Sequence, residues 1–237
     1  MTAAKPAVRV TEERKLGVRE LAAQATRESI LKAAIKVFAK NGFDGGRVEQ
    51  ISKAAKSYDR MIYYYFGSKE GLYIAALEEI YRRFNDAESE LHLDESKPRE
   101  ALRAVIRFMW SYYLKHPEFI TLLNTENLHR GKHIAKSPTA KEYSSPAVGV
   151  IERVLHTGAT QGLFRADLTA RDLYLTIAGL CYFYLSNRFT LSAFLGEDLE
   201  APSALQQWQA HVIDTVERAV APAMAAVSVT SKGNGHG

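Results

Sequence analysis

Residues 48–73 read VEQISKAAKSYDRMIYYYFGSKEGLY, and this stretch decides the fold of the N-terminal part of the chain. Apolar residues recur at helical spacing near its start, at Val48, Ile51, Ala54 and Ala55. Lys56 and Ser57 interrupt that pattern, and a second short helix with Ile62, Tyr65 and Phe66 on one face follows. Two short helices joined by a tight turn, with a stabilising helix before them, are typical of a helix-turn-helix motif.

Longer helices are expected on both sides of this pair. We expect the preceding helix to begin at Thr26, a good N-cap residue, and to stop at Asn41-Gly42, because glycine favours the left-handed backbone of a helix end. Gly67 and Ser68 open the following helix, with Ser68 as its N-cap. The three helices together predict a compact head.

The rest of the chain also shows helical spacing and no strand-like alternation. Further helices are expected at residues 68–91, 98–115, 117–131, 147–162, 172–189 and 202–220. The chain is therefore predicted to be all-α, with a three-helix helix-turn-helix domain at residues 25–72 and a helical bundle at residues 73–222. A basic flexible arm is expected at residues 1–24 and a disordered tail at residues 223–237.

Composition narrows the class of protein. The apolar fraction is 46%, near the globular average, and no apolar run reaches the roughly 18–20 residues that span a bilayer. The first thirty residues contain no secretory signal, and Cys181, as the one cysteine, cannot form an intrachain disulfide, so a cytoplasmic location is expected. No catalytic motif stands out, so neither an enzyme nor a cofactor is predicted.

Positive charge is concentrated at the N-terminal end. Residues 1–70 hold 14 Lys and Arg against 8 Asp and Glu, whereas the remaining residues hold 17 against 19. A basic head on a slightly acidic body indicates a polyanionic partner for the head alone. The alternative is an ordinary solvated face of Lys and Arg.

The second short helix leaves Tyr63 and Tyr64 on its outer face when its apolar face turns inward. In a helix-turn-helix this helix enters the major groove of DNA, while hydroxyls and basic residues around it contact phosphates. A tyrosine hydroxyl can donate to a phosphate while its ring packs on the sugar. Lys69 adds a cation beside the free N–H groups at the start of the next helix.

Base reading is expected from the residues just before the tyrosine pair. Arg60 can make a bidentate contact to guanine, and Asp59 either accepts from cytosine N4 or caps its helix. Met61 either meets a thymine methyl or packs inside the head, and Arg47 is either a phosphate clamp or a solvated charge. The expected DNA-binding set is Arg47, Ser57, Tyr58, Asp59, Arg60, Tyr63, Tyr64 and Lys69.

Residues 26–72 resemble the DNA-binding domain of the tetracycline-repressor (TetR) family. The marks are ILKAAIKVFAKNGFDG and then VEQISKAAKSYDRMIYYYFGSKEGLY. The resemblance implies a homodimeric transcription regulator, usually a repressor, that binds a pseudo-palindromic double-stranded operator and is released by a small molecule. The sequence differs at the turn, where Lys56 replaces the family's common glycine; a left-handed backbone at Lys56 costs about 1 kcal/mol.

The family holds its small-molecule effector inside the helical bundle that follows the head. The matching candidates here are Phe108, Trp110, Tyr113, His116, Phe119, Leu123, Glu126, Asn127, Tyr174, Cys181 and Tyr182. For each aromatic residue the alternative is ordinary core packing. Trp110 and Asn127 are favoured, because an indole N–H and a carboxamide in an apolar bundle need partners.

A metal site is the other possibility in this region. Glu126, His129 and His133 have a spacing that can place them on one helical face. Gly131 interrupts that face and no fourth ligand is evident, so solvated charge is the favoured interpretation and no metal is predicted.

The last two long helices, at residues 173–189 and 202–220, resemble the pair that joins two subunits in the family. We therefore expect a homodimer through them, since two half-sites need two heads; a buried helical hairpin is the alternative. No membrane partner is expected. An alternative function is a helical small-molecule-binding protein or enzyme whose head does not bind DNA specifically. A third is an architectural DNA-binding protein, against which the acidic body argues.

Overall fold

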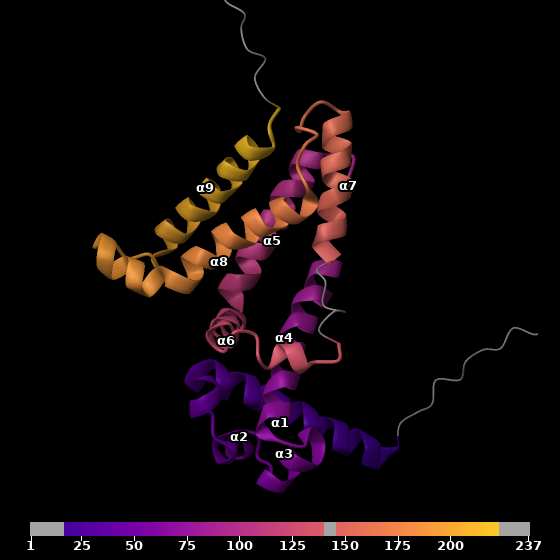
Figure 1. The fold of residues 1–237 in the computed structure, drawn as a ribbon, viewed down its shortest axis with the longest axis vertical. Helices are drawn as coiled ribbons and strands as arrows, with labels where there is room; N and C mark the ends of the chain where they lie inside the picture. The colour runs from indigo at the N-terminus through magenta and orange to yellow at the C-terminus, as the bar shows by residue number, and fades with distance from the viewer. Residues whose placement is uncertain (1–16, 140–145, 223–237) are drawn as a thin grey trace, which may run out of the picture. The chain divides into compact units, whose positions relative to one another are not determined.

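The computed structural model describes residues 17–139 and 146–222, and every regular element within these ranges is a helix (Figure 1). The all-α prediction is therefore confirmed. Two compact units divide the chain, Met1–Ala76 and Leu77–Gly237, and helix α4 belongs to both. The tail expected at 223–237 and the first sixteen residues of the expected arm lie outside the described residues.

The head consists of α1 (Val18–Gly45), α2 (Val48–Ala54), α3 (Asp59–Phe66) and the first turns of α4 (Lys69–Ser89). Its core is formed by side chains with no or almost no exposed surface: Ile30, Ala34, Ile35, Phe38, Ile51, Ile62, Leu72 and Tyr73. The Phe38 and Tyr73 rings meet edge to face at 5.1 Å between centroids. These contacts hold α1, α3 and α4 around one apolar centre.

Helix α1 begins at Val18, so the predicted start at Thr26 is wrong. The Glu20 carboxylate accepts from the backbone N–H of Gly17 at 2.9 Å, which caps the helix two turns before Thr26. The Thr26 hydroxyl donates to the carbonyl of Ala22 and so bonds within the helix instead of capping it. Residues 18–24, expected to be a flexible arm, are helical.

The predicted stop of α1 is confirmed at Gly42, whose φ of 70° breaks the regular helix before a last turn ends at Gly45. Gly46 then passes against the core: a Cβ atom there would lie 2.5 Å from the Phe38 ring. A side chain at residue 46 would therefore displace a fully buried aromatic ring.

The turn between α2 and α3 has a left-handed backbone at Lys56, with φ of 51°. The N–H of Ser57 donates to the carbonyl of Ser52 at 2.9 Å, and the N–H of Lys56 donates to that of Lys53 at 3.2 Å. This pair of bonds is a Schellman motif, which glycine usually completes. The turn is thus closed by a lysine in a conformation that L residues rarely adopt.

Ser68 caps α4 as predicted, because its Oγ accepts from the N–H of Gly71 at 2.9 Å. A Cβ atom on Gly71 would lie 2.1 Å from the carbonyl oxygen of Phe66, so α3 and α4 approach too closely for a side chain there. This tight connection fixes the end of α3 against the start of α4.

The second unit contains the rest of α4, α5 (Pro98–Lys115), α6 (Pro117–Leu128), the 3-10 helix η1 (Ile134–Lys136), α7 (Pro146–Thr160), α8 (Ala170–Leu195) and α9 (Pro202–Val220). Helix α5 is central and packs against α6, α7, α8 and α9. Pro98 begins α5 as expected, and α8 extends to Leu195, beyond the predicted end at residue 189. No helix in the described ranges has the length and apolarity needed to cross a bilayer.

Candidate nucleic-acid interface and effector site

The outer face of α3 is set by the burial of Ile62, which has no exposed surface. Tyr63 and Tyr64 point away from the core, with 53% and 77% of their surface exposed. Tyr65 and Phe66 are half-buried. The predicted division of this helix into an inner and an outer face is confirmed, and the outer face carries two phenol hydroxyls.

Arg60 lies on the same exposed side of α3. Its guanidinium carbon is 5.2 Å from the centroid of the Tyr58 ring, and both side chains are exposed. An arginine resting on an aromatic ring keeps its N–H donors free at the edge of the plane. Arg47 is also exposed, at the N-cap of α2, and Ser57 is half-buried in the turn.

Asp59 is held inside the motif. Its carboxylate accepts a short hydrogen bond from the hydroxyl of Ser52, a buried residue of α2. The side chain does not cap α3, because Tyr58 is the N-cap residue there. Asp59 therefore ties α2 to α3, and of the two roles expected for it the capping role is wrong.

Lys69 is half-buried at the start of α4. Its ammonium donates to the carbonyl of Asp44 at 3.2 Å and lies 4.8 Å from the centroid of the Phe43 ring. The cation thus stabilises the carbonyl end of α1. An ammonium has three N–H donors, so a phosphate contact from Lys69 stays a prediction.

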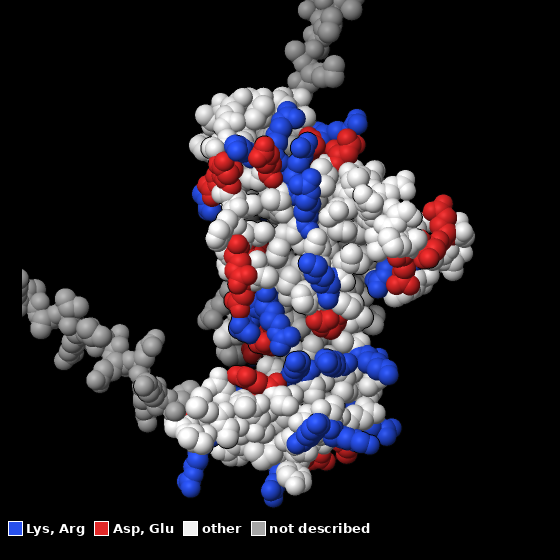
Figure 2. Space-filling view, turned by 180° about the vertical axis from the view of Figure 1, so that it is seen from behind, with Lys and Arg blue, Asp and Glu red and all other residues white. Residues whose placement is uncertain are grey.

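The described part of the head has more basic than acidic side chains on its surface. Over the head, the face shown in Figure 2 carries mainly Lys and Arg. The exposed basic residues of the helix-turn-helix itself are Arg47, Lys53, Lys56 and Arg60. This charge distribution matches the polyanionic partner expected from the sequence.

A stacked aromatic cluster fills the bundle between α4, α5 and α6. Tyr113 stacks on Phe119 at 5.5 Å and on Phe84 at 5.9 Å between ring centroids, and Phe108 lies 5.7 Å from Phe84. Three of the predicted effector residues, Phe108, Tyr113 and Phe119, are therefore brought together. Phe84 belongs with them and was missed by the sequence analysis.

Phenol groups from α4, α5 and α8 converge beside this cluster. Burial raises the pKa of Tyr113 well above its usual value, and the nearby phenols of Tyr174 and Tyr81 add to that shift. Burial also raises the pKa of Tyr81, to which Tyr174 and Tyr182 contribute. We call Tyr81, Tyr113, Tyr174 and Tyr182 the tyrosine cluster.

Asn124 of α6 connects to this cluster by hydrogen bonds. Its carboxamide oxygen accepts from the Tyr182 hydroxyl and, at 3.1 Å, from the Ser186 hydroxyl. Cys181 is buried on the same helix as Tyr182, and burial raises the pKa of its thiol to about 12. No motif marks Asn124 in the sequence, and Asn127 in the same helix was predicted instead.

Two predicted effector residues lie elsewhere. Asn127 is exposed, and its carboxamide donates to the carbonyl of Leu123 one turn earlier, so the expectation of a partner inside an apolar bundle is wrong. Trp110 is buried, but its ring packs against Tyr184 at 5.6 Å, on the α8–α9 side of α5. Leu123 is half-buried, as is His116, which bonds to Glu118 where α5 meets α6.

Glu126 and His133 form a buried pair, which corrects the expectation of solvated charge. The Glu126 carboxylate accepts from the backbone N–H of His133 at 2.8 Å and of Ile134 at 3.0 Å, and lies 2.8 Å from the His133 ring nitrogen Nδ1. The chain turns between them through positive φ at Arg130 and Gly131. No group of three potential metal ligands occurs in the part of the chain that the structure describes.

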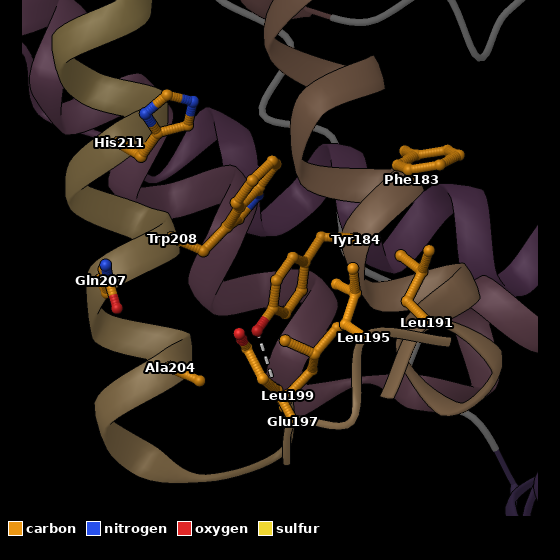
Figure 3. Close-up of a pocket in the computed structure, with 10 residues that line it drawn as sticks. All are labelled: Phe183, Tyr184, Leu191, Leu195, Glu197, Leu199, Ala204, Gln207, Trp208 and His211. Carbon is orange, nitrogen blue, oxygen red and sulfur yellow. Dashed lines mark hydrogen bonds between the residues drawn. The ribbon is translucent and has the colours of Figure 1, made fainter. Parts of the chain in front are cut away.

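Helices α8 and α9 enclose an apolar groove of about 490 Å³. Figure 3 shows Tyr184 against Trp208 at its base; the rings stack at 4.9 Å, and the Tyr184 hydroxyl donates to the carbonyl of Leu199. Phe183 lines the groove with 56% of its surface exposed. Other exposed apolar side chains continue along α8: Leu175, Phe189, Phe194 and Leu195. We call these residues, with Phe183 and Trp208, the α8–α9 face.

Comparison with known proteins agrees with this architecture. The family model "Bacterial regulatory proteins, tetR family" matches residues 30–76, and "Tetracyclin repressor-like, C-terminal domain" matches residues 98–216. The chain is 54% identical to the HTH-type transcriptional repressor NicS of Pseudomonas putida over 207 aligned residues. This alignment covers 87% of this chain and 98% of that protein. The chain belongs to the TetR family.

Membership of this family defines the class of protein: a DNA-binding transcriptional regulator with a helix-turn-helix head, and not an enzyme. The fold is similar to that of SCO4942 from Streptomyces coelicolor, with a TM-score of 0.62, 21% identity and coverage of 82% of this chain and 98% of that one. The fold is also similar to that of the TetR-family regulator HI0893 from Haemophilus influenzae, with a TM-score of 0.60 and 19% identity. The match covers 85% of this chain and 99% of that one. At these identities the likeness shows the fold alone.

Proposed function

We propose that the protein is a repressor that binds a pseudo-palindromic DNA operator as a homodimer and is released from it by a small molecule. The observation that supports this most directly is the outer face of α3, where exposed Arg60, Tyr63 and Tyr64 are fixed by the buried Ile62. A helix of this kind fits the major groove, where its side chains reach bases and phosphates. Its similarity to a protein named as a transcriptional repressor favours repression over activation.

Within the operator, the two kinds of contact are divided between different side chains. Arg60 makes a bidentate contact to a guanine, because its guanidinium is exposed and rests on the Tyr58 ring. Tyr63 and Tyr64 donate to phosphates and carry no sequence information. Arg47 and the remaining N–H donors of Lys69 add phosphate contacts from α2 and α4.

The α8–α9 face joins two subunits. Exposed aromatic and aliphatic side chains along α8 leave an apolar surface that water solvates poorly in a single chain. A second copy covers this surface across a two-fold axis, since an isologous contact uses the same face on both subunits. The resulting dimer carries two heads, which a pseudo-palindrome with two half-sites requires.

The effector binds among the tyrosine cluster and the stacked rings of Phe84, Tyr113 and Phe119. Stacked rings favour a flat, partly apolar molecule, and phenol hydroxyls hydrogen-bond its polar groups. The protein works in the cytoplasm, where its DNA and its small-molecule signal are both accessible. It needs no cofactor for this cycle.

Electrophoretic mobility shifts on a duplex that the protein itself selects from random DNA test the DNA-binding proposal. Arg60→Ala should relax preference at one base pair by about 1–3 kcal/mol, whereas Tyr64→Phe should weaken binding to all sequences alike. Arg171→Ala, an exposed arginine of α8, is the matched control and should change neither. An Arg60→Ala protein with full sequence preference contradicts the base-reading assignment.

Sedimentation of two variants tests the dimer. Phe183→Glu places a charge on the α8–α9 face and should shift the protein toward monomer at micromolar concentration. Leu128→Glu is the matched control, because Leu128 is an exposed apolar residue at the end of α6, outside that face, and should leave the dimer intact. An unchanged Phe183→Glu dimer, or a monomeric Leu128→Glu protein, contradicts the assignment of the interface.

A further inference from the structure

The first three turns of α1 have almost no packing partners among the residues that the structure describes. The helix begins at Val18, but its first buried residue is Ile30, and residues 18–29 are all exposed or half-buried. Val18 exposes 84% of its surface. At 1.5 Å per residue this overhang is about 18 Å long. The overhang, residues 18–29, lies before residues 30–76, which match the family model of the DNA-binding domain. The match to that model therefore assigns no function to the overhang.

The overhang has one basic face. Arg19, Ala23 and Arg27 are spaced four residues apart, so they lie on one side of the helix. The same line continues into the head as Ile30, Ala34 and Phe38, which are fully buried. The side of α1 that packs on the helix-turn-helix therefore continues past it as an arginine face.

Arg27 lies at the boundary between the head and the overhang. Its guanidinium carbon is 5.0 Å from the centroid of the Phe66 ring, at the last residue of α3. Figure 1 shows the indigo first turns of α1 running out beyond α3. The overhang thus starts beside the C-terminal end of the helix that carries Tyr63 and Tyr64, and Arg19 lies two turns farther out, at about 12 Å.

Charge favours one kind of partner for this face. Neither Arg19 nor Arg27 forms an ion pair with another described residue, and the acidic residues of the overhang are engaged elsewhere. Glu20 caps the helix through Gly17, and Glu28 accepts from the side chain of Gln24. Ala23, between the arginines, lets a neighbouring backbone approach closely.

We propose that the overhang of α1 is an additional DNA contact, in which Arg19 binds a backbone phosphate beyond the half-site that α3 reads. The inference rests on the proposed DNA binding and extends it outward along the duplex. DNA is the occupant because the face is basic and continues the surface that presents α3. The contact reads no bases, so it lengthens the bound segment without changing the operator sequence.

Salt-dependent affinity of the full-length protein tests the proposal, measured on a self-selected duplex with long flanks and on the same duplex trimmed at the half-sites. Arg19→Ala should reduce the slope of log K against log salt by about 1 for each subunit on the long duplex. On the trimmed duplex, Arg19→Ala and the unaltered protein should bind equally. Lys32→Ala is the matched control, since Lys32 is exposed on the opposite side of α1.

Two results overturn the inference alone: an unchanged slope for Arg19→Ala on the long duplex, or an equal loss for Lys32→Ala. Failure of the unaltered protein to bind any duplex at low salt overturns the proposed function as well. Circular dichroism of Arg19→Ala should match that of the unaltered protein, because the side chain is exposed and makes no contact that holds the head together.

Discussion

Replacing Glu126 should destabilise the second unit far more than any surface substitution. The carboxylate is buried between α6 and η1 and accepts from two backbone N–H groups, those of His133 and Ile134, while its other oxygen faces the His133 ring. Both Glu126 and His133 are almost fully buried. Glu126→Ala therefore leaves several donors without an acceptor in a place that water reaches poorly.

The size of the effect follows from these contacts. An unsatisfied buried N–H donor costs about 1–3 kcal/mol, and Glu126→Ala leaves two of them, the backbone N–H groups of His133 and Ile134, without their acceptor. We expect Glu126→Ala to lower the free energy of unfolding of the second unit by about 3–5 kcal/mol. Glu126→Gln retains an oxygen for the two backbone N–H groups, so its cost should be about 1–2 kcal/mol.

Urea unfolding followed by tryptophan fluorescence measures this difference. Both tryptophans, Trp110 and Trp208, lie in α5 and α9, so the signal reports the second unit and not the head. All variants are compared at one protein concentration, because dimer formation adds to apparent stability. A Glu126→Ala cost below about 1 kcal/mol, or an equal cost for Ala and Gln, would refute the reasoning.

Three further predictions concern the turn, the thiol and the effector site. Lys56→Gly should raise the stability of the head by up to about 1 kcal/mol in thermal unfolding followed by circular dichroism, because glycine adopts the left-handed backbone without strain; a loss of stability contradicts the strain. The Cys181 thiol, with its pKa raised to about 12 by burial, should resist Ellman's reagent at pH 8 until urea unfolds the protein, and rapid reaction of the native protein contradicts the burial. Tyr182→Phe removes the hydroxyl that donates to Asn124 and should weaken release from DNA by a small aromatic effector found in a compound screen, with unchanged DNA affinity in its absence; unchanged release counts against the tyrosine cluster.

The parts of the fold that follow from local sequence were predictable. Ile62 fixes which side of α3 faces inward, so the exposure of Tyr63 and Tyr64 could be inferred from helical spacing alone. The cap at Ser68 follows from residues adjacent to it. These features depend on contacts within a few residues.

The start of α1 was missed because two cap signals compete. Thr26 is a good N-cap residue, but Gly17 and Glu20 satisfy the first turn, and several alanines between them favour continuing the helix. The helix propensity of the whole segment outweighed the N-cap preference of the single residue Thr26. The sequence pattern of the overhang, with arginines four residues apart, becomes visible only once the helix is known to extend that far.

The effector region was only partly predictable, because residues in one helix face different partners. Phe108 and Trp110 are two residues apart in α5, and they pack against opposite groups of helices. The Glu126–His133 pair depends on a turn at Arg130 and Gly131, which folds the chain back on α6. Such contacts arise from the packing of helices, which no local spacing specifies.

Nuclease footprinting of the full-length protein on a self-selected duplex tests the central claim most directly. A dimer with α3 in the major groove should protect two half-sites related by two-fold symmetry, with centres one or more helical turns apart. Protection should fade as salt rises, because phosphate contacts supply much of the affinity. A folded dimer that protects no segment at low salt, or protects random DNA equally, contradicts the claim that this protein reads an operator through α3.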